Sequence, residues 1–426
     1  MDTRRLPAHP DLDQYKKQAK DLLKQLQSGV PDAVRRLQQS HPRFKGLSDA
    51  NARIAACVLA DAQLVVAREH GFSSWAAFKR RIQVSARALE DAVSRRGAAP
   101  SDDDVRELLL RQRVGDPLGA GLVVGLVDAH GRRVVTLDTS RADAKASDGD
   151  TLFGASLATL PFTALLLADM VQDGGMAWTD PVSMHLPAGV TVPQRHGRSI
   201  TLLDLALHRS GLPVLPPGFQ GRPFADLTVE NLYAFLATYE LSRDIDAKTE
   251  ISLVGYGLLG LALAYRACED FSTLLRRRVL APLEMRETRL AGDGPLDSAV
   301  GLRSTVREIL KFLSAMLGHT GSLLTRTIQQ LQRTRDPRGR ERRIGWMTFS
   351  VDGVFMPGGR DIMWVDGMLG GDRTFVGFAP RDGIGVVTVA IGSVRPGGLA
   401  RLNAAQNLGL HLLDPRWPAL DTPVAT

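Results

Sequence analysis

The sequence is poor in cysteine, which excludes several classes of protein. Only Cys57 and Cys268 occur among 426 residues, too few for a disulfide framework or a cysteine-based metal site. We therefore expect a reduced, intracellular setting. The nine histidines show no paired ligand spacing such as His-Glu-x-x-His, so we expect neither a metal site nor a cofactor.

Long apolar runs and targeting segments are also missing. No stretch of about 18 uncharged apolar residues occurs, as a membrane span would require. The first residues, MDTRRLPAHPDLDQYKK, lack the apolar segment of about 7–15 residues found in secretory signal peptides. These absences predict a cytoplasmic protein that does not interact with a membrane.

The composition is that of a folded protein, with 44% hydrophobic and 23% charged residues. Its charge is unevenly distributed: residues 1–100 hold 18 Lys and Arg against 10 Asp and Glu, a net charge of +8, whereas the remainder has a net charge of −1. A basic segment of this kind can bind nucleic acid or an acidic partner. Because no DNA-reading motif accompanies the charge, solvated helical faces are the favoured interpretation, and nucleic-acid binding stays an alternative.

Residues 1–95 are predicted to form a small, basic, all-helical module. Apolar residues recur there every three or four positions, the spacing of amphipathic helices. Three of these helical patterns begin at Leu12, at Pro31 and at Ser48 or Asp49, and the third ends before Gly71. A fourth begins at Ser73 or Ser74 and is expected to extend to Arg95 or Arg96. The following text, RRGAAPSDDD, breaks the pattern and predicts a linker at about 96–104.

Residues 105–418 are predicted to form a second, α+β domain, followed by a tail at 419–426. The text GLVVGLVDAHGRRVVTLD predicts two strands around a turn at 128–131. A helical middle begins at Thr159 or Pro161, and strand-like segments such as RTFVGFAP and GIGVVTVAIGS come late, before a closing helix at about 399–413. Strands at both ends of a domain with helices between them predict one sheet that joins the two ends.

The text of this domain resembles the serine β-lactamase and penicillin-binding-protein superfamily, in its class C-like branch of esterases and D-Ala-D-Ala peptidases. The resemblance is carried, in the family's order, by DTLFGASLATLPFTALLLADMVQDGG, ITLLDLALHRSGLP, GYGLLGLALA, GLRSTVREILKFL and GGDRTFVGFAPRDGIGVVTVAIGS. It implies a β-lactamase/transpeptidase-like domain: an antiparallel sheet flanked by helices, with a helical subdomain. The first 90 residues resemble a helical module at the N-terminus of assorted bacterial proteins.

The first catalytic motif of this family is Ser-x-x-Lys at the start of a buried helix, where the lysine manages the proton of the serine hydroxyl. The anchors Phe153 and Phe162 fix the register, which places Leu157 at the serine position and Leu160 at the lysine position. A slip of one residue would offer Ser156 as nucleophile. The lysine position would then hold a threonine, which cannot act as a base near neutral pH.

The other two motifs are altered in the same way. Ile251 and Leu253 occupy the tyrosine and asparagine positions of Tyr-x-Asn, while Ser252 remains and Tyr256 aligns with a structural tyrosine of the family. In the strand motif His-x-Gly, Val365 occupies the position of the cationic histidine, and Leu369 occupies the position of a threonine further along the strand. In that segment Asp366 would repel an anionic substrate, and the backbone shape is kept by Gly367, Gly370 and Gly371.

Aliphatic residues at five catalytic positions predict that the family's hydrolase activity is absent. The favoured hypothesis is a pseudoenzyme that binds an apolar small molecule or a protein partner. An alternative is a redeployed enzyme, one that carries out acyl transfer, cyclisation or isomerisation of an apolar substrate. Its candidate catalytic residues are Ser156, Glu250 and Asp366.

Overall fold

The computed structural model divides the chain into two compact units, residues 1–94 and residues 95–351 with 361–426. It describes residues 11–44, 57–70, 98–113, 121–136, 148–219, 226–333, 344–348, 362–369, 371–391 and 404–415, with single residues at 72, 74–76, 78, 79, 82 and 417. Within these ranges, no helix is long and apolar enough to cross a membrane. Each unit is treated by itself.

The described part of the first unit includes three helices packed around one core. They are α1 (Leu12–Gln27), α2 (Pro31–Ser40) and α4 (Leu59–Glu69), with the turn η1 (Pro42–Phe44). The buried residues of α1 are Tyr15, Ala19, Leu22 and Leu26, which confirms the predicted amphipathic face. Of the predicted third helix, the part before residue 57 lies outside the described residues, as does most of the text after Gly71.

The second unit is built on a six-stranded antiparallel sheet with the order β2-β1-β11-β10-β9-β8. Its strands are β1 (Gly121–Asp128), β2 (Gly131–Thr136), β8 (Met347–Thr348), β9 (Met363–Leu369), β10 (Asp372–Ala379) and β11 (Ile384–Ile391). Strand β1 pairs with β11 from Gly121↔Ile391 to Val127↔Gly385. The early hairpin thus joins the late strands, as predicted for an α+β domain.

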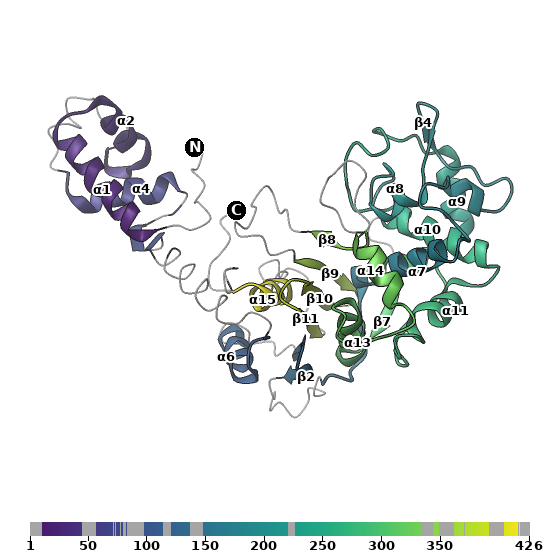
Figure 1. The fold of residues 1–426 in the computed structure, drawn as a ribbon. Helices are drawn as coiled ribbons and strands as arrows, with labels where there is room; N and C mark the ends of the chain where they lie inside the picture. The colour runs from purple at the N-terminus through teal and green to yellow at the C-terminus, as the bar shows by residue number, and fades with distance from the viewer. Residues whose placement is uncertain are drawn as a thin grey trace. The chain divides into compact units, whose positions relative to one another are not determined.

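Side-chain alternation along the strands gives the sheet two apolar faces. One face contributes Val123, Val365 and Val387 to the larger core, which includes α7 and α13. The other contributes Val124, Trp364 and Phe375 to a second cluster under α15. Figure 1 shows α13 and α15 beside this sheet. Their bounds are α7 (Leu160–Gln172), α13 (Val306–Met316) and α15 (Ala404–Leu413).

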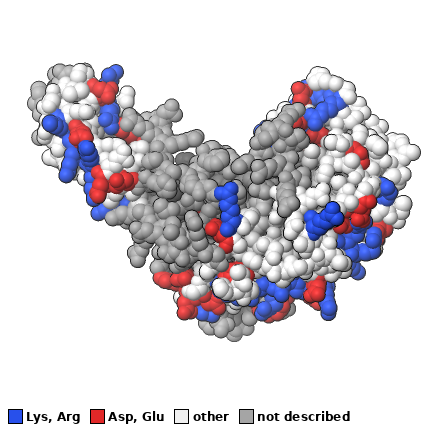
Figure 2. Space-filling view, in the orientation of Figure 1, with Lys and Arg blue, Asp and Glu red and all other residues white. Residues whose placement is uncertain are grey.

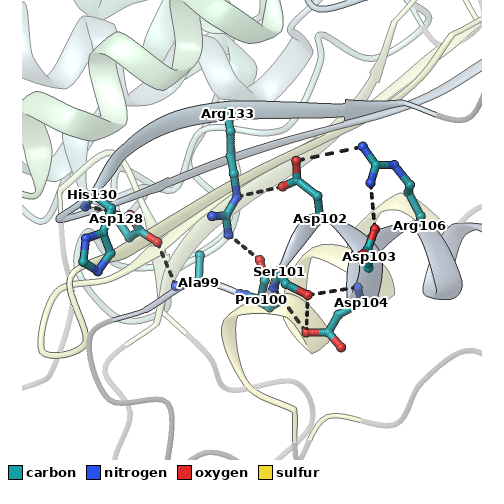
Figure 3. Close-up of polar contacts among 10 residues, drawn as sticks. All are labelled: Ala99, Pro100, Ser101, Asp102, Asp103, Asp104, Arg106, Asp128, His130 and Arg133. Atoms are coloured by element: carbon teal, nitrogen blue, oxygen red, sulfur yellow. Dashed lines mark hydrogen bonds and ion pairs between the residues drawn. The ribbon is translucent and has the colours of Figure 1, made fainter.

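A polar network fastens helix α6 (Asp102–Arg113) to the β1–β2 hairpin (Figure 3). The Ala99 N–H donates to Oδ2 of Asp128 at 3.0 Å. Arg133 donates to the Pro100 carbonyl and pairs with Oδ1 of Asp102 at 3.1 Å. The prediction of a linker at 96–104 is therefore wrong for residues 98–104, because these contacts make them part of the second unit and the helix begins at Asp102.

A helical layer and two small sheets complete the second unit. The helices are α8 (Leu202–Ala206), α9 (Val229–Thr238), α10 (Leu253–Ala267), α11 (Phe271–Leu275), α12 (Asp297–Val300) and α14 (Thr325–Arg333), and the tighter or wider turns are η2 (Ser156–Thr159), η3 (Val182–His185) and η5 (Arg276–Leu280). The small sheets are β3-β7-β6 and β4-β5. Their strands are β3 (Phe153–Gly154), β4 (Gln194–Arg195), β5 (Arg198–Ser199), β6 (Arg289–Leu290) and β7 (Leu302–Ser304).

Candidate functional site

Leu157 and Leu160, which the sequence predicts at the Ser-x-x-Lys positions, lie where turn η2 passes into helix α7. Leu160 is 2% exposed and belongs to the larger core, whereas Leu157 is half-buried and packs against that core. The Thr159 hydroxyl already has hydrogen-bond partners. Its Oγ1 donates to the Ser156 carbonyl of the same turn at 2.7 Å and accepts from the Leu302 N–H of β7 at 3.1 Å. No polar side chain at these four positions is therefore poised to take a proton.

Ser156, a candidate nucleophile, has an unusual backbone and an occupied hydroxyl. Its φ is +49°, in the left-handed region that glycine adopts more readily. The side chain is 4% exposed, and its Oγ donates to the Met368 carbonyl on β9 at 3.2 Å. This hydrogen bond ties turn η2 to the strand, which gives the serine a structural role.

Strand β9 brings the third motif against turn η2. Val365 is fully buried in the larger core. A Cβ atom added to Gly367 would lie 2.5 Å from Oγ of Ser156 and 2.8 Å from the Leu157 nitrogen. The strand therefore approaches the turn as closely as glycine allows.

The end of β9 and the start of β10 contact Gly154 of strand β3, which belongs to a separate small sheet. A Cβ added to Gly154 would meet Leu369 at 3.3 Å. The Gly154 N–H donates to Oδ2 of Asp372 at 3.1 Å, a role for Asp372 that its sequence position on a surface turn did not reveal. Gly371 has a φ of +94°, whereas Gly370 lies outside the described residues.

The Tyr-x-Asn positions lie at the start of helix α10. Ser252 caps this helix: its Oγ donates to the Pro213 carbonyl at 2.7 Å and accepts from the Gly255 N–H at 2.8 Å. Leu253 is 6% exposed in the larger core, and Ile251 is half-buried against it. Ser252 is thus a capping residue between two aliphatic side chains.

A histidine and a tyrosine lie behind the start of α10. Tyr256 is fully buried, and its hydroxyl donates to the Ala206 carbonyl at 3.0 Å; burial raises its pKa above the ordinary value. The His208 ring lies 4.6 Å from the tyrosine ring, and its Nδ1 accepts the Ser252 N–H at 3.2 Å. Burial lowers the pKa of His208 to about 4, so its ring is neutral near pH 7.

Neither of the two acidic candidates is positioned to act as an acid or base beside the aliphatic residues. Asp366 pairs with Phe375 across the strands, so alternation places it on the face that carries Trp364, opposite to Val365. Burial raises the pKa of Asp366, and the charge of Arg373 opposes that rise. Glu250 is about half-exposed and forms an ion pair with Arg243 at 2.6 Å.

The arrangement therefore offers an aliphatic surface and no proton-transfer pair. Leu160, Leu253 and Val365 belong to one buried cluster, with Leu157 and Ile251 packed against it. In this part of the molecule Val214 is 47% exposed, and its carbonyl accepts the Leu253 N–H at 3.1 Å. Across the described ranges, no group of three or more His, Cys, Asp or Glu residues is arranged to hold a metal ion.

Charged residues of the first unit are mostly balanced where the structure describes them. Arg36 pairs with Glu69 at 2.7 Å, and the buried Asp61 pairs with Arg43 and His41 at 3.0 and 3.2 Å. On the face in Figure 2, basic and acidic side chains are interspersed over the described surface. The described part of residues 1–100 holds 9 Lys and Arg against 6 Asp and Glu, a net charge of +3, and the rest of the basic excess lies outside the described residues.

The sheet, its two covered faces and the helix that follows η2 define the serine β-lactamase and penicillin-binding-protein class of fold. The chain belongs to the Beta-lactamase family, whose model matches residues 110–410. It is 33% identical over 136 residues to the D-alanyl-D-alanine-carboxypeptidase/endopeptidase AmpH of Escherichia coli K12. That match covers 32% of this chain and 35% of the relative, so the chain spans about a third of the relative's length.

Solved structures show the same fold at lower identity. A β-lactamase/D-alanine carboxypeptidase from Yersinia pestis superposes with a TM-score of 0.61 at 23% identity, covering 72% of this chain and 98% of that one. A class C β-lactamase from Rhodobacter sphaeroides gives 0.57 at 20% identity, covering 73% and 99%. These likenesses extend over the second unit's share of the chain and concern its fold.

Proposed function

We propose that this member of the Beta-lactamase family lacks serine hydrolase activity and acts by binding a ligand at the aliphatic site. The observation that supports the proposal is that the five residues predicted at the family's catalytic positions pack in or against one core: Leu157, Leu160, Ile251, Leu253 and Val365. Aliphatic side chains neither attack a carbonyl nor transfer a proton.

The magnitudes support the same conclusion. Removing one member of a catalytic serine unit costs about 10⁴–10⁶ in kcat, and further losses add little, because the unit has already failed. Burying a leucine or valine instead contributes roughly 1.5–3 kcal/mol to stability. Replacing catalytic polar groups by aliphatic ones thus exchanges activity for stability. The peptidase activity named for the AmpH relative is the one we propose to be lost here.

The ligand that the site fits best is an apolar small molecule. Leu157 and Ile251 are only half-buried, and Val214 is 47% exposed, so apolar surface stays accessible around the buried members. Binding is preferred over a redeployed catalytic function, because Ser156 donates to a carbonyl, Glu250 is in an ion pair and Asp366 lies on the other face of the sheet.

The test is a hydrolysis assay on the full chain with nitrocefin and p-nitrophenyl esters, run beside the Ser156→Ala variant. We expect both proteins to give the rate of buffer alone. Hydrolysis by the wild-type chain that disappears in Ser156→Ala would overturn the proposal. A residual rate that is equal in both proteins would be attributed to a contaminant.

A further inference from the structure

Two arginines lie directly opposite each other in the small sheet of the second unit. Arg289 on β6 is the cross-strand partner of Arg303 on β7, and the next pair is Leu290 with Leu302. Both arginines are exposed, while Leu302 is buried. Side chains directly opposite in an antiparallel pair have Cβ atoms about 4.5–5.5 Å apart, so two guanidinium groups project from one face of this sheet.

This pair lacks a neutralising carboxylate among the residues that the structure describes. The Arg289 side chain donates to the main-chain carbonyl of Glu287 at 3.4 Å, and within the described ranges the Arg303 side chain makes no ion pair or hydrogen bond. Like charges directly opposite in a sheet destabilise it. An oxyanion between the two guanidinium groups would remove that cost through charge-assisted, bidentate hydrogen bonds.

The arginine pair is continuous with the aliphatic site. Arg303 is also the cross-strand partner of Gly154 on β3, so the two residues lie on the same face of the small sheet. On that face the space beside Gly154 is filled by Leu369, 3.3 Å from the position of a Cβ. Leu369 is two residues beyond Gly367, which abuts Leu157. Neighbouring residues thus connect the aliphatic side chain of Leu157 with the two arginines, through Leu369 and Gly154.

A carboxylate lies beside Gly154 but has partners of its own. Asp372 pairs with Leu369 across β9 and β10, and its Oδ2 accepts the Gly154 N–H at 3.1 Å. The two arginines carry a charge of +2, which favours a monoanionic or dianionic head group over a neutral one.

From this juxtaposition we infer that the ligand is an anionic amphiphile, with its alkyl chain on the aliphatic site and its phosphate or carboxylate head between Arg289 and Arg303. The inference rests on the proposed function for the location of the chain. The site takes the head group through the arginine pair, and the tail through Leu369 and the half-buried Leu157.

The test is calorimetric titration of the full chain with n-decyl phosphate, decanoate, 1-decanol and inorganic phosphate at low salt. We expect decyl phosphate to bind at least about tenfold more tightly than 1-decanol. Arg289→Gln and Arg303→Gln should each weaken decyl phosphate binding about 3- to 10-fold and leave 1-decanol binding unchanged. Decanoate separates a carboxylate head from a phosphate head. The matched control is Arg276→Gln, an exposed arginine of η5, which should change neither affinity.

The outcomes separate the two proposals. Equal affinities for decyl phosphate and 1-decanol, or an equal loss in Arg276→Gln, would overturn the anionic head while leaving an aliphatic site in place. Absence of binding by every alkyl probe would overturn the anionic amphiphile and the apolar ligand together. Ser156-dependent ester hydrolysis would overturn only the loss of activity. Without ligand, Arg303→Gln should not lower the Tm, since it relieves a like-charge pair; a lower Tm would indicate a structural arginine.

Discussion

Introducing a lysine at Leu160, the predicted lysine position of the first motif, tests whether this position is part of the core. Leu160 is the first residue of α7, is 2% exposed and lies in the larger core. The variant Leu160→Lys would place an ammonium group among aliphatic side chains and at the positive end of a helix, both of which disfavour the cation. The matched variant Leu160→Met keeps the volume and the apolar character.

The expected decrease in the free energy of unfolding of Leu160→Lys is large compared with the total stability of a domain. Removing the buried leucine costs about 1.5–3 kcal/mol. If burial lowers the lysine pKa by about 3 units, the ammonium costs roughly 4 kcal/mol more at pH 7, at about 1.36 kcal/mol per unit. The sum is about 6 kcal/mol, against a total stability of about 5–15 kcal/mol for a typical domain. Leu160→Met should cost less than about 1.5 kcal/mol.

The measurement is urea unfolding of both variants at pH 7 and pH 9. Because the native pKa of the introduced lysine is lowered, the unfolded chain binds the extra proton between that pKa and about 10.4. The stability of Leu160→Lys should therefore rise with pH over this range, whereas Leu160→Met should not share the rise. A loss below about 1 kcal/mol that does not depend on pH would refute the reasoning, because it would mean that the position is open to water.

Two further predictions concern the backbone and the buried histidine. Gly367→Ala should destabilise the second unit by about 1–3 kcal/mol, since its Cβ would lie 2.8 Å from the Leu157 nitrogen; the control Gly321→Ala, with nothing within 4 Å, should change stability by less than about 1 kcal/mol in urea unfolding. The lowered pKa of His208, about 4, predicts that stability falls as pH decreases from about 6.5 to 4. The variant His208→Asn, whose asparagine suits a φ of +55°, should reduce this dependence of stability on pH, measured by thermal unfolding at several pH values. The control His196→Asn, at an exposed histidine with a φ of +50°, should not reduce it. An equal pH dependence in the wild type and both variants would contradict the lowered pKa of His208.

The sequence predicted the fold of the second unit well because three signals indicated the same elements: the alternation of apolar residues in strands, the glycines that end helices and strands, and the segments that resemble the family. The hairpin at 128–131 and the late strands follow directly from local patterns. The linker at 96–104 was misplaced for a physical reason. Its Gly, Pro and Asp residues predict a break, but Ser101 caps α6 by accepting the Asp104 N–H at 3.2 Å, and Arg133 and Asp128 hold the segment from a distant hairpin.

The sequence by itself gives the prediction that the catalytic positions are aliphatic, because the anchors Phe153 and Phe162 set the register in which Leu157 and Leu160 stand at the first motif. Only the tertiary structure decided what surrounds them. Strand alternation turned Asp366 to the opposite face of the sheet, the close approach of Gly367 gave the Ser156 hydroxyl its acceptor, and the pairing of β6 with β7 brought Arg289 to Arg303. These residues are far apart in the sequence, and their meeting depends on strand register, which local sequence patterns do not specify.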